Sequence, residues 1–69
     1  MRLSARNIIK GKVLEITLGA TTAHVKLDVG GGTVIFSSIT NDAVQALGLK
    51  VGDSAYAVIK ASDVMVGKD

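Results

Sequence analysis

Apolar and polar side chains alternate along residues 22–29, and this period of two is typical of a half-buried β-strand. The apolar positions of this stretch are Ala23, Val25, Leu27 and Val29. Apolar-rich stretches bounded by glycines and other turn residues predict four further strands, at residues 8–18, 33–39, 54–60 and 64–66. Gly11, inside the first of these, indicates a bulge or a bend in that strand.

The pattern changes between residues 40 and 48, where apolar side chains recur at helical spacing. Thr40 is a suitable N-cap, Asp42 adds an acid to the first turn, and Gly48 stands where helices often end in a left-handed residue. The expected order is therefore β-β-β-α-β-β, in one domain that covers residues 1–69. That order is typical of the OB-fold. We predict an all-β, OB-fold-like five-stranded barrel with one short helix between strands 3 and 4.

The chain is short for the amount of aliphatic side chain that it carries. It has 69 residues, of which 48% are hydrophobic and only 3% aromatic. A domain of this size buries only about 60% of the surface that its unfolded chain exposes, and without cysteine it gains no stability from disulfides. Exposed apolar patches mark interaction sites. We therefore expect a homo-oligomer in which strand faces or edges pair between subunits.

Positive charge is concentrated near the N-terminus, although the net charge of the chain is only +2. The first twelve residues contain no acid and four cations, which are Arg2, Arg6, Lys10 and Lys12. Such a cluster suggests an anionic partner, but it is equally typical of a solvated surface. No apolar run is long enough for a membrane span or a signal peptide. We expect a cytoplasmic protein that does not associate with membranes.

Features that could indicate an enzyme or a nucleotide site have simpler interpretations. Residues 30–32 are all glycine, but they connect two predicted strands, whereas a phosphate loop opens a helix. His24 has no second histidine or serine–acid pair to act with, and the six carboxylates are scattered singly. We therefore expect no catalytic activity. Nucleic-acid binding by an OB-fold uses stacking aromatics, and this chain has only Phe36 and Tyr56.

Hydrogen-bond donors lie on both sides of the predicted sheet in the sequence. Ser4 and Arg6 precede the first long strand, and the run from Lys60 to Ser62 begins at the last residue of the fourth. The first and last strands of an OB-like barrel can lie close together, within one subunit or across an interface. Cations, hydroxyls and free backbone N–H groups would then form an anion site. On these residues alone, ordinary surface charges are the alternative interpretation.

Five motifs resemble those of the molbindins, small cytoplasmic proteins of bacteria that bind molybdate and tungstate. These motifs are SARN (residues 4–7), KGKV (10–13), GGG (30–32), ALGLKVGD (46–53) and AVIKASDVMVGKD (57–69). The resemblance extends from Ser4 to Asp69, and its most specific part is the pairing of SARN with KAS about fifty residues later. It implies an OB-like barrel assembled as a hexamer, a trimer of dimers, with oxyanions held at subunit interfaces.

The resemblance also implies which residues hold the oxyanion. One subunit would contribute Ser4, Ala5 and Arg6, and a neighbouring subunit would contribute Lys60, Ala61 and Ser62. Thr40 matches a further family position, whereas Ala43 stands where many relatives have serine, which removes one hydroxyl contact. A second kind of site, near a threefold axis, corresponds to Gly19, Ala20, Thr21 and Thr22.

Molybdate is a tetrahedral dianion that carries no proton at neutral pH, so its site needs donors and no carboxylate. The implied residues meet this requirement. The function that we expect is cytoplasmic storage and homeostasis of molybdate or tungstate, with no organic cofactor and no nucleic-acid partner. A nucleic-acid-binding OB module and a ligand-sensing or assembly domain without a storage role are the alternatives.

Overall fold

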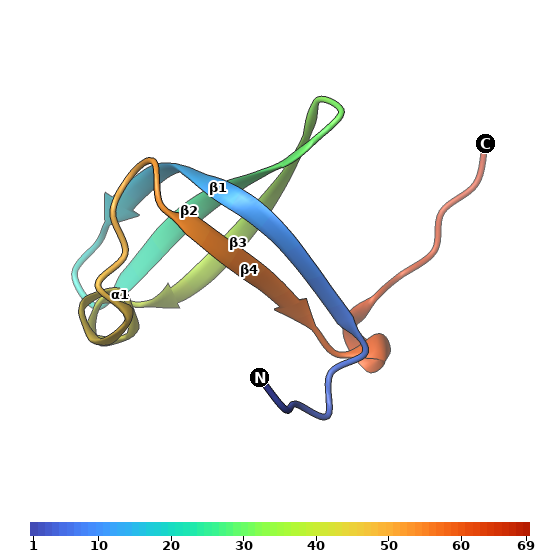
Figure 1. Ribbon diagram of the computed structural model, residues 1–69, viewed down its shortest axis with the longest axis horizontal. Helices are drawn as coiled ribbons and strands as arrows, with labels where there is room; N and C mark the ends of the chain where they lie inside the picture. The colour runs from blue at the N-terminus through green and yellow to red at the C-terminus, as the bar shows by residue number, and fades with distance from the viewer.

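Four antiparallel strands and one short helix form the body of the molecule (Figure 1). The computed structural model describes the whole chain, residues 1–69. The elements are, in chain order, β1 (Asn7–Leu18), β2 (Thr22–Gly30), β3 (Thr33–Thr40), α1 (Asn41–Leu47), β4 (Ser54–Ile59) and the short 3-10 helix η1 (Ala61–Asp63). The first four predicted strands and the predicted helix are confirmed. Neither helix has the length and apolar character that a membrane crossing would require.

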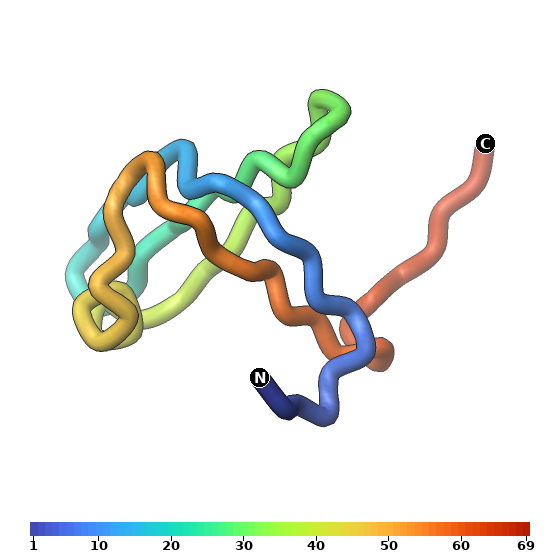
Figure 2. Tube along the Cα trace, viewed as in Figure 1, coloured from blue at the N-terminus to red at the C-terminus, as the bar shows by residue number.

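The strands lie in the order β3-β2-β1-β4. The long strand β1 is shared between two neighbours, because its first half pairs with β4 and its second half pairs with β2. The sheet curls along its length (Figures 1 and 2), so that residues of the two edge strands, β3 and β4, line one apolar hollow. Their outer edges have no partner strand, and the sheet is therefore open where a barrel would be closed.

The hydrophobic core is small and lies on the concave side of the sheet. Its six buried residues are Val13, Ala23, Val25, Leu27, Val44 and Ala57. Three of them come from β2, where the alternation read from the sequence places every second side chain inward. Only 6 of the 69 residues are buried, so most of the aliphatic side chains remain partly in contact with solvent.

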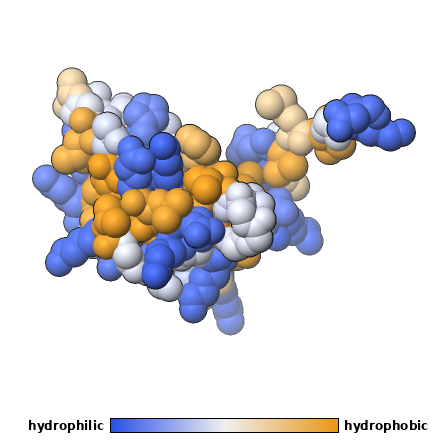
Figure 3. Space-filling view, turned by 90° about the horizontal axis from the view of Figure 1, so that it is seen from above, coloured by the Kyte–Doolittle hydropathy of each residue, from blue (hydrophilic) through white to orange (hydrophobic).

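The expected fifth strand at residues 64–66 is absent. This segment has no strand pairing, and it leads the chain away from the body in two perpendicular views (Figures 1 and 3). Val64 is 49% exposed, and Met65 and Val66 are each 94% exposed. No strand of the sheet pairs with this segment, and after η1 the chain points away from the sheet (Figure 1). The single chain therefore has no fifth strand, and its sheet does not close into a barrel. The prediction of a five-stranded barrel is wrong in both respects.

Gly11 does not form the bulge that the sequence predicted there. It pairs regularly with Ala55, and the irregularity of β1 comes later, between Val13 and Glu15. A Cβ atom at Gly11 would lie 2.7 Å from the backbone oxygen of Asp28. The glycine is required because the backbone of β2 approaches β1 this closely.

The helix α1 begins and ends as its sequence predicts. The Thr40 hydroxyl oxygen accepts a hydrogen bond from the backbone N–H of Ala43 at 3.0 Å, which caps the N-terminus. Gly48 has φ 61°, in the left-handed region, and its N–H donates to the Gln45 carbonyl. Val44 is the buried residue through which the helix packs on the core.

Candidate functional site

The pairing of β1 with β4 brings the two donor segments to the same end of the sheet. Asn7 at the start of β1 is the register partner of Ile59 at the end of β4. Residues 4–6, which precede β1, therefore lie at the same end of the sheet as residues 60–62, which follow β4. Figures 1 and 2 show both segments at this end. The two halves of the predicted site meet within one chain, so this juxtaposition does not need a neighbouring subunit.

These segments hold donors that have no partner within the chain. The backbone N–H groups of Ser4, Ala5, Arg6 and Lys60 form no hydrogen bond to another residue. Neither Arg6 nor Lys60 forms an ion pair, because the one salt bridge of the molecule joins Lys26 to Glu15. Five of the six residues are exposed and Ala5 is half-buried. The arrangement offers two cations, two hydroxyls and free N–H groups to solvent, which is the chemistry of an anion site.

Thr40 lies elsewhere. It ends β3, pairs with Thr22 and caps α1, so it lies beside the far end of β1. The 12-residue strand β1 separates it from Arg6, in a molecule whose longest extent is 35 Å. Because the Thr40 hydroxyl oxygen already accepts from Ala43, its O–H proton is free to be donated outward. Thr40 and Arg6 of one chain cannot bind the same small ion.

The predicted second site, residues 19–22, is the turn beside Thr40. Asn41 holds this turn twice, through its backbone N–H to the Thr21 carbonyl at 2.8 Å and through its side-chain amide to the Gly19 carbonyl at 3.0 Å. The Gly19 N–H donates to the Thr22 carbonyl at 2.8 Å, whereas the N–H groups of Ala20 and Thr21 have no partner in the chain. All four turn residues are exposed. The turn is thus a second, separate set of free donors.

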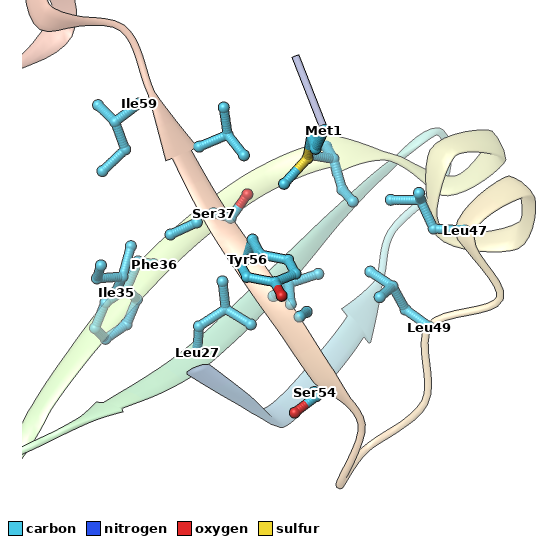
Figure 4. A pocket seen from close by; sticks show the side chains of 15 residues that line it. Met1, Leu27, Ile35, Phe36, Ser37, Leu47, Leu49, Ser54, Tyr56 and Ile59 are labelled. Carbon is cyan, nitrogen blue, oxygen red and sulfur yellow. The ribbon is translucent and has the colours of Figure 1, made fainter. Parts of the chain in front are cut away.

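The other candidate features lead away from an ion site. An open hollow of about 670 Å³ lies between the edge strands, and 13 of its 15 lining residues are hydrophobic. Figure 4 shows Tyr56, Phe36 and Leu27 among the side chains around it, with Leu47 and Leu49 beside the helix. None of the lining side chains is charged, so the hollow does not suit a dianion. No group of three metal-ligating side chains is present either.

A small charged cluster occupies neighbouring positions of the first three strands. Lys26 Nζ lies 3.1 Å from the Glu15 carboxylate and 5.4 Å from the centre of the Phe36 ring. The hydrogen bond from Lys26 and its positive charge lower the pKa of Glu15 below its usual value of 4.5, with a smaller contribution from the Thr17 hydroxyl. Lys26 is therefore engaged by partners of its own, unlike Arg6 and Lys60.

Comparison with known sequences places the chain in one family. The TOBE domain family matches residues 3–66. A probable molybdenum-pterin-binding protein of Haemophilus influenzae is 52% identical over 67 residues, which cover 97% of this chain and 97% of that protein. The chain belongs to the molbindin family of TOBE domains.

Solved structures of related proteins have the same fold as this chain. MopII from Clostridium pasteurianum has a TM-score of 0.90 at 45% identity, with coverage of 97% of this chain and 100% of that chain. A molybdate-binding protein from Sporomusa ovata has a TM-score of 0.92 at 37% identity, covering 99% and 100%. The cytoplasmic molybdate-binding protein ModG, in a structure with molybdate bound, has a TM-score of 0.89 at 57% identity, covering 94% and 46%.

Two asparagines at the site were missed by sequence reasoning. Asn7 and Asn41 each donate a side-chain amide hydrogen bond to a backbone carbonyl next to a donor segment. The letter N in the SARN motif was the available signal for Asn7. An asparagine at the start of a strand is unremarkable in a sequence, and only the pairing with β4 gives this one a partner.

Proposed function

We propose that this chain binds molybdate, and tungstate with little discrimination, and that it stores these oxyanions in the cytoplasm. The observation that carries the proposal is the meeting of residues 4–6 and 60–62 at one end of the sheet, with Arg6 and Lys60 unpaired. The relatives that are named for binding molybdenum-pterin or molybdate support the choice of ligand. The proposed role is binding without catalysis and without an organic cofactor.

The residues of the proposed site have three different roles in binding. Arg6 and Lys60 neutralise the two negative charges of the ligand, and charge-assisted hydrogen bonds are the stronger class. The hydroxyls of Ser4 and Ser62 orient the ion, and the backbone amides of Ala5 and Ala61 complete the shell. No acid pairs with either cation, so a ligand that only accepts hydrogen bonds leaves no group unsatisfied.

Thr40 joins this site from a second subunit. Within one chain it lies at the opposite end of β1 from Arg6, so a shared ion requires two copies whose opposite ends meet. Self-association is supported by the exposed apolar surface, which Figure 3 shows as patches between the polar groups and which includes Met65 and Val66, each 94% exposed. A hexamer built as a trimer of dimers is the assembly that we propose.

The turn at residues 19–22 is proposed as the second anion site. Its free N–H groups at Ala20 and Thr21 and the hydroxyls of Thr21 and Thr22 are all donors. One turn offers few donors and no cation, so several copies around a symmetry axis would have to contribute together. Ligand held between subunits stabilises the assembly by RT ln(1 + [L]/Kd).

Oxyanion selectivity tests the proposed function directly. We expect isothermal titration calorimetry to give similar affinities for molybdate and tungstate, weaker binding of sulfate, and much weaker binding of phosphate. Phosphate is partly protonated at neutral pH, and a proton without an acceptor costs about 1–3 kcal/mol, roughly 5- to 100-fold in affinity. Sulfate has the same charge as molybdate, but its shorter bonds leave the donors out of reach.

Two outcomes would contradict the proposal. Equal affinity for phosphate and molybdate would show that the site attracts any anion by charge alone. Binding of single-stranded oligonucleotides with a steep salt dependence would favour the nucleic-acid-binding alternative instead. That alternative has little support here, because the two aromatic residues lie on separate strands, and Lys26 already contacts the Phe36 ring.

A further inference from the structure

The Asn7 side chain holds the peptide group that leads into one half of the proposed site. Its Nδ2 donates to the backbone carbonyl of Ile59 at 3.1 Å, across a sequence separation of 52 residues. Ile59 is the last residue of β4, and the next residue is Lys60. The bond therefore joins the residue that follows Arg6 to the residue that precedes Lys60.

This bond fixes the direction of a donor as well as the position of a segment. The carbonyl of Ile59 and the N–H of Lys60 belong to one planar peptide group and point in opposite directions. When the Asn7 amide draws the carbonyl toward itself, the Lys60 N–H is turned away from Asn7. That N–H has no partner within the chain, so it is presented to solvent on the side where residues 60–62 lie.

No side chain of residues 60–63 forms a hydrogen bond to the sheet. Lys60 stands at the N-cap position of η1 without a side-chain cap, and the turn is closed only by its own bonds, from the Asp63 N–H to the Lys60 carbonyl and from the Val64 N–H to the Ala61 carbonyl. These bonds shape the turn but do not attach it to the sheet. The Asn7 amide supplies that attachment at the peptide where the turn begins.

We infer that Asn7 is a positioning residue for oxyanion binding, which rests on the proposed function. It does not touch the ion. It sets the orientation of the Lys60 peptide relative to residues 4–6, so that donors from both segments converge on one ligand. Free donors that are already oriented lose less freedom when the ion binds.

A matched pair of substitutions separates this role from simple packing. Leucine has nearly the shape of asparagine but no amide, so Asn7→Leu keeps the bulk and removes the bond to Ile59. Thr17→Val is the control, because valine has nearly the shape of threonine and the change removes another side-chain hydrogen bond of β1, from the Thr17 hydroxyl to the Glu15 carboxylate at 3.3 Å. Thr17 belongs to neither proposed anion site.

The measurement is molybdate titration of the full-length proteins, followed for the class of sites that Arg6→Ala removes. We expect Asn7→Leu to weaken this class roughly 3- to 10-fold, through faster dissociation, and Thr17→Val to leave it within about twofold. The salt dependence of the affinity should be unchanged in Asn7→Leu, because both cations are still present. A role in folding alone would not produce this combination.

Several results would overturn the inference. Unchanged affinity in Asn7→Leu would show that the orientation of the peptide does not matter. An equal loss in Thr17→Val would show a general effect on stability, and thermal unfolding of the ligand-free proteins would reveal it. If the unmodified protein bound no molybdate, the proposed function would fail, and this inference with it. Normal binding by the unmodified protein, with no effect of Asn7→Leu, would contradict the inference alone.

Discussion

Replacing Arg6 by alanine should abolish high-affinity molybdate binding while the sheet stays folded. Arg6 precedes β1, is exposed and forms no ion pair, so its loss removes no contact that the fold depends on. A hydrogen bond to a charged group contributes about 1.5–3 kcal/mol, roughly 10- to 100-fold in affinity. A bidentate guanidinium contributes two such bonds. Calorimetry with molybdate, together with circular dichroism of the same samples, measures both parts of this prediction.

Two controls make the result specific to this side chain. Arg2→Ala changes the net charge by the same amount four residues earlier and should bind molybdate within about twofold of the unmodified protein, because exposed charges at a distance are screened. Arg6→Lys keeps the charge but loses the planar fork, and an intermediate affinity is expected. Unchanged affinity in Arg6→Ala would remove Arg6 from the site.

Mixing two inactive variants should restore binding if Thr40 reaches the site from a neighbouring subunit. Thr40→Ala removes a donor to the charged ligand and is expected to weaken binding roughly 10- to 100-fold. Arg6→Ala damages the other half of the site. In oligomers refolded from an equal mixture of the two variants, about a quarter of the sites combine an intact Arg6 with an intact Thr40. Calorimetry of the mixture should recover that fraction of high-affinity sites.

A second mixture tests which residues share a chain. Arg6 and Lys60 adjoin within one chain, so Arg6→Ala refolded with Lys60→Ala should recover no sites. Recovery in this mixture would mean that the two cations come from different subunits. Thr40→Ser keeps the hydroxyl and the helix cap and should bind nearly as well as the unmodified protein. Failure of the Arg6→Ala and Thr40→Ala mixture to bind better than either variant would mean that Thr40 does not reach the Arg6 site from a neighbouring subunit.

Local patterns were sufficient to predict most of the elements. The alternation in β2 and the N-cap and left-handed glycine of α1 depend on neighbours in the sequence, and the structure confirms both. The fifth strand could not be predicted reliably, because three apolar residues, Val64 to Val66, resemble a strand wherever they occur. Whether they form one depends on pairing with a neighbouring strand, and in this chain no strand pairs with them.

The residues of the candidate site could be listed from the sequence, but their arrangement in space could not. The sequence supplied Arg6 and Lys60 as cations, and only the register of Asn7 with Ile59 brings them to one end of the sheet. The pairing of β3 with β2 separates Thr40 from them, because it places Thr40 beside the far end of β1. The role of Gly11 was equally hidden, because a close approach by the Asp28 carbonyl is a tertiary contact.

The most direct test of oxyanion binding between subunits is native mass spectrometry of the protein with molybdate added. We expect the bound molybdate to be found on a hexamer, and monomers produced by dilution to carry none. Addition of molybdate should also shift the population toward the hexamer, because a ligand that binds only the assembled form stabilises it. A stable monomer that binds molybdate tightly would contradict the interface site.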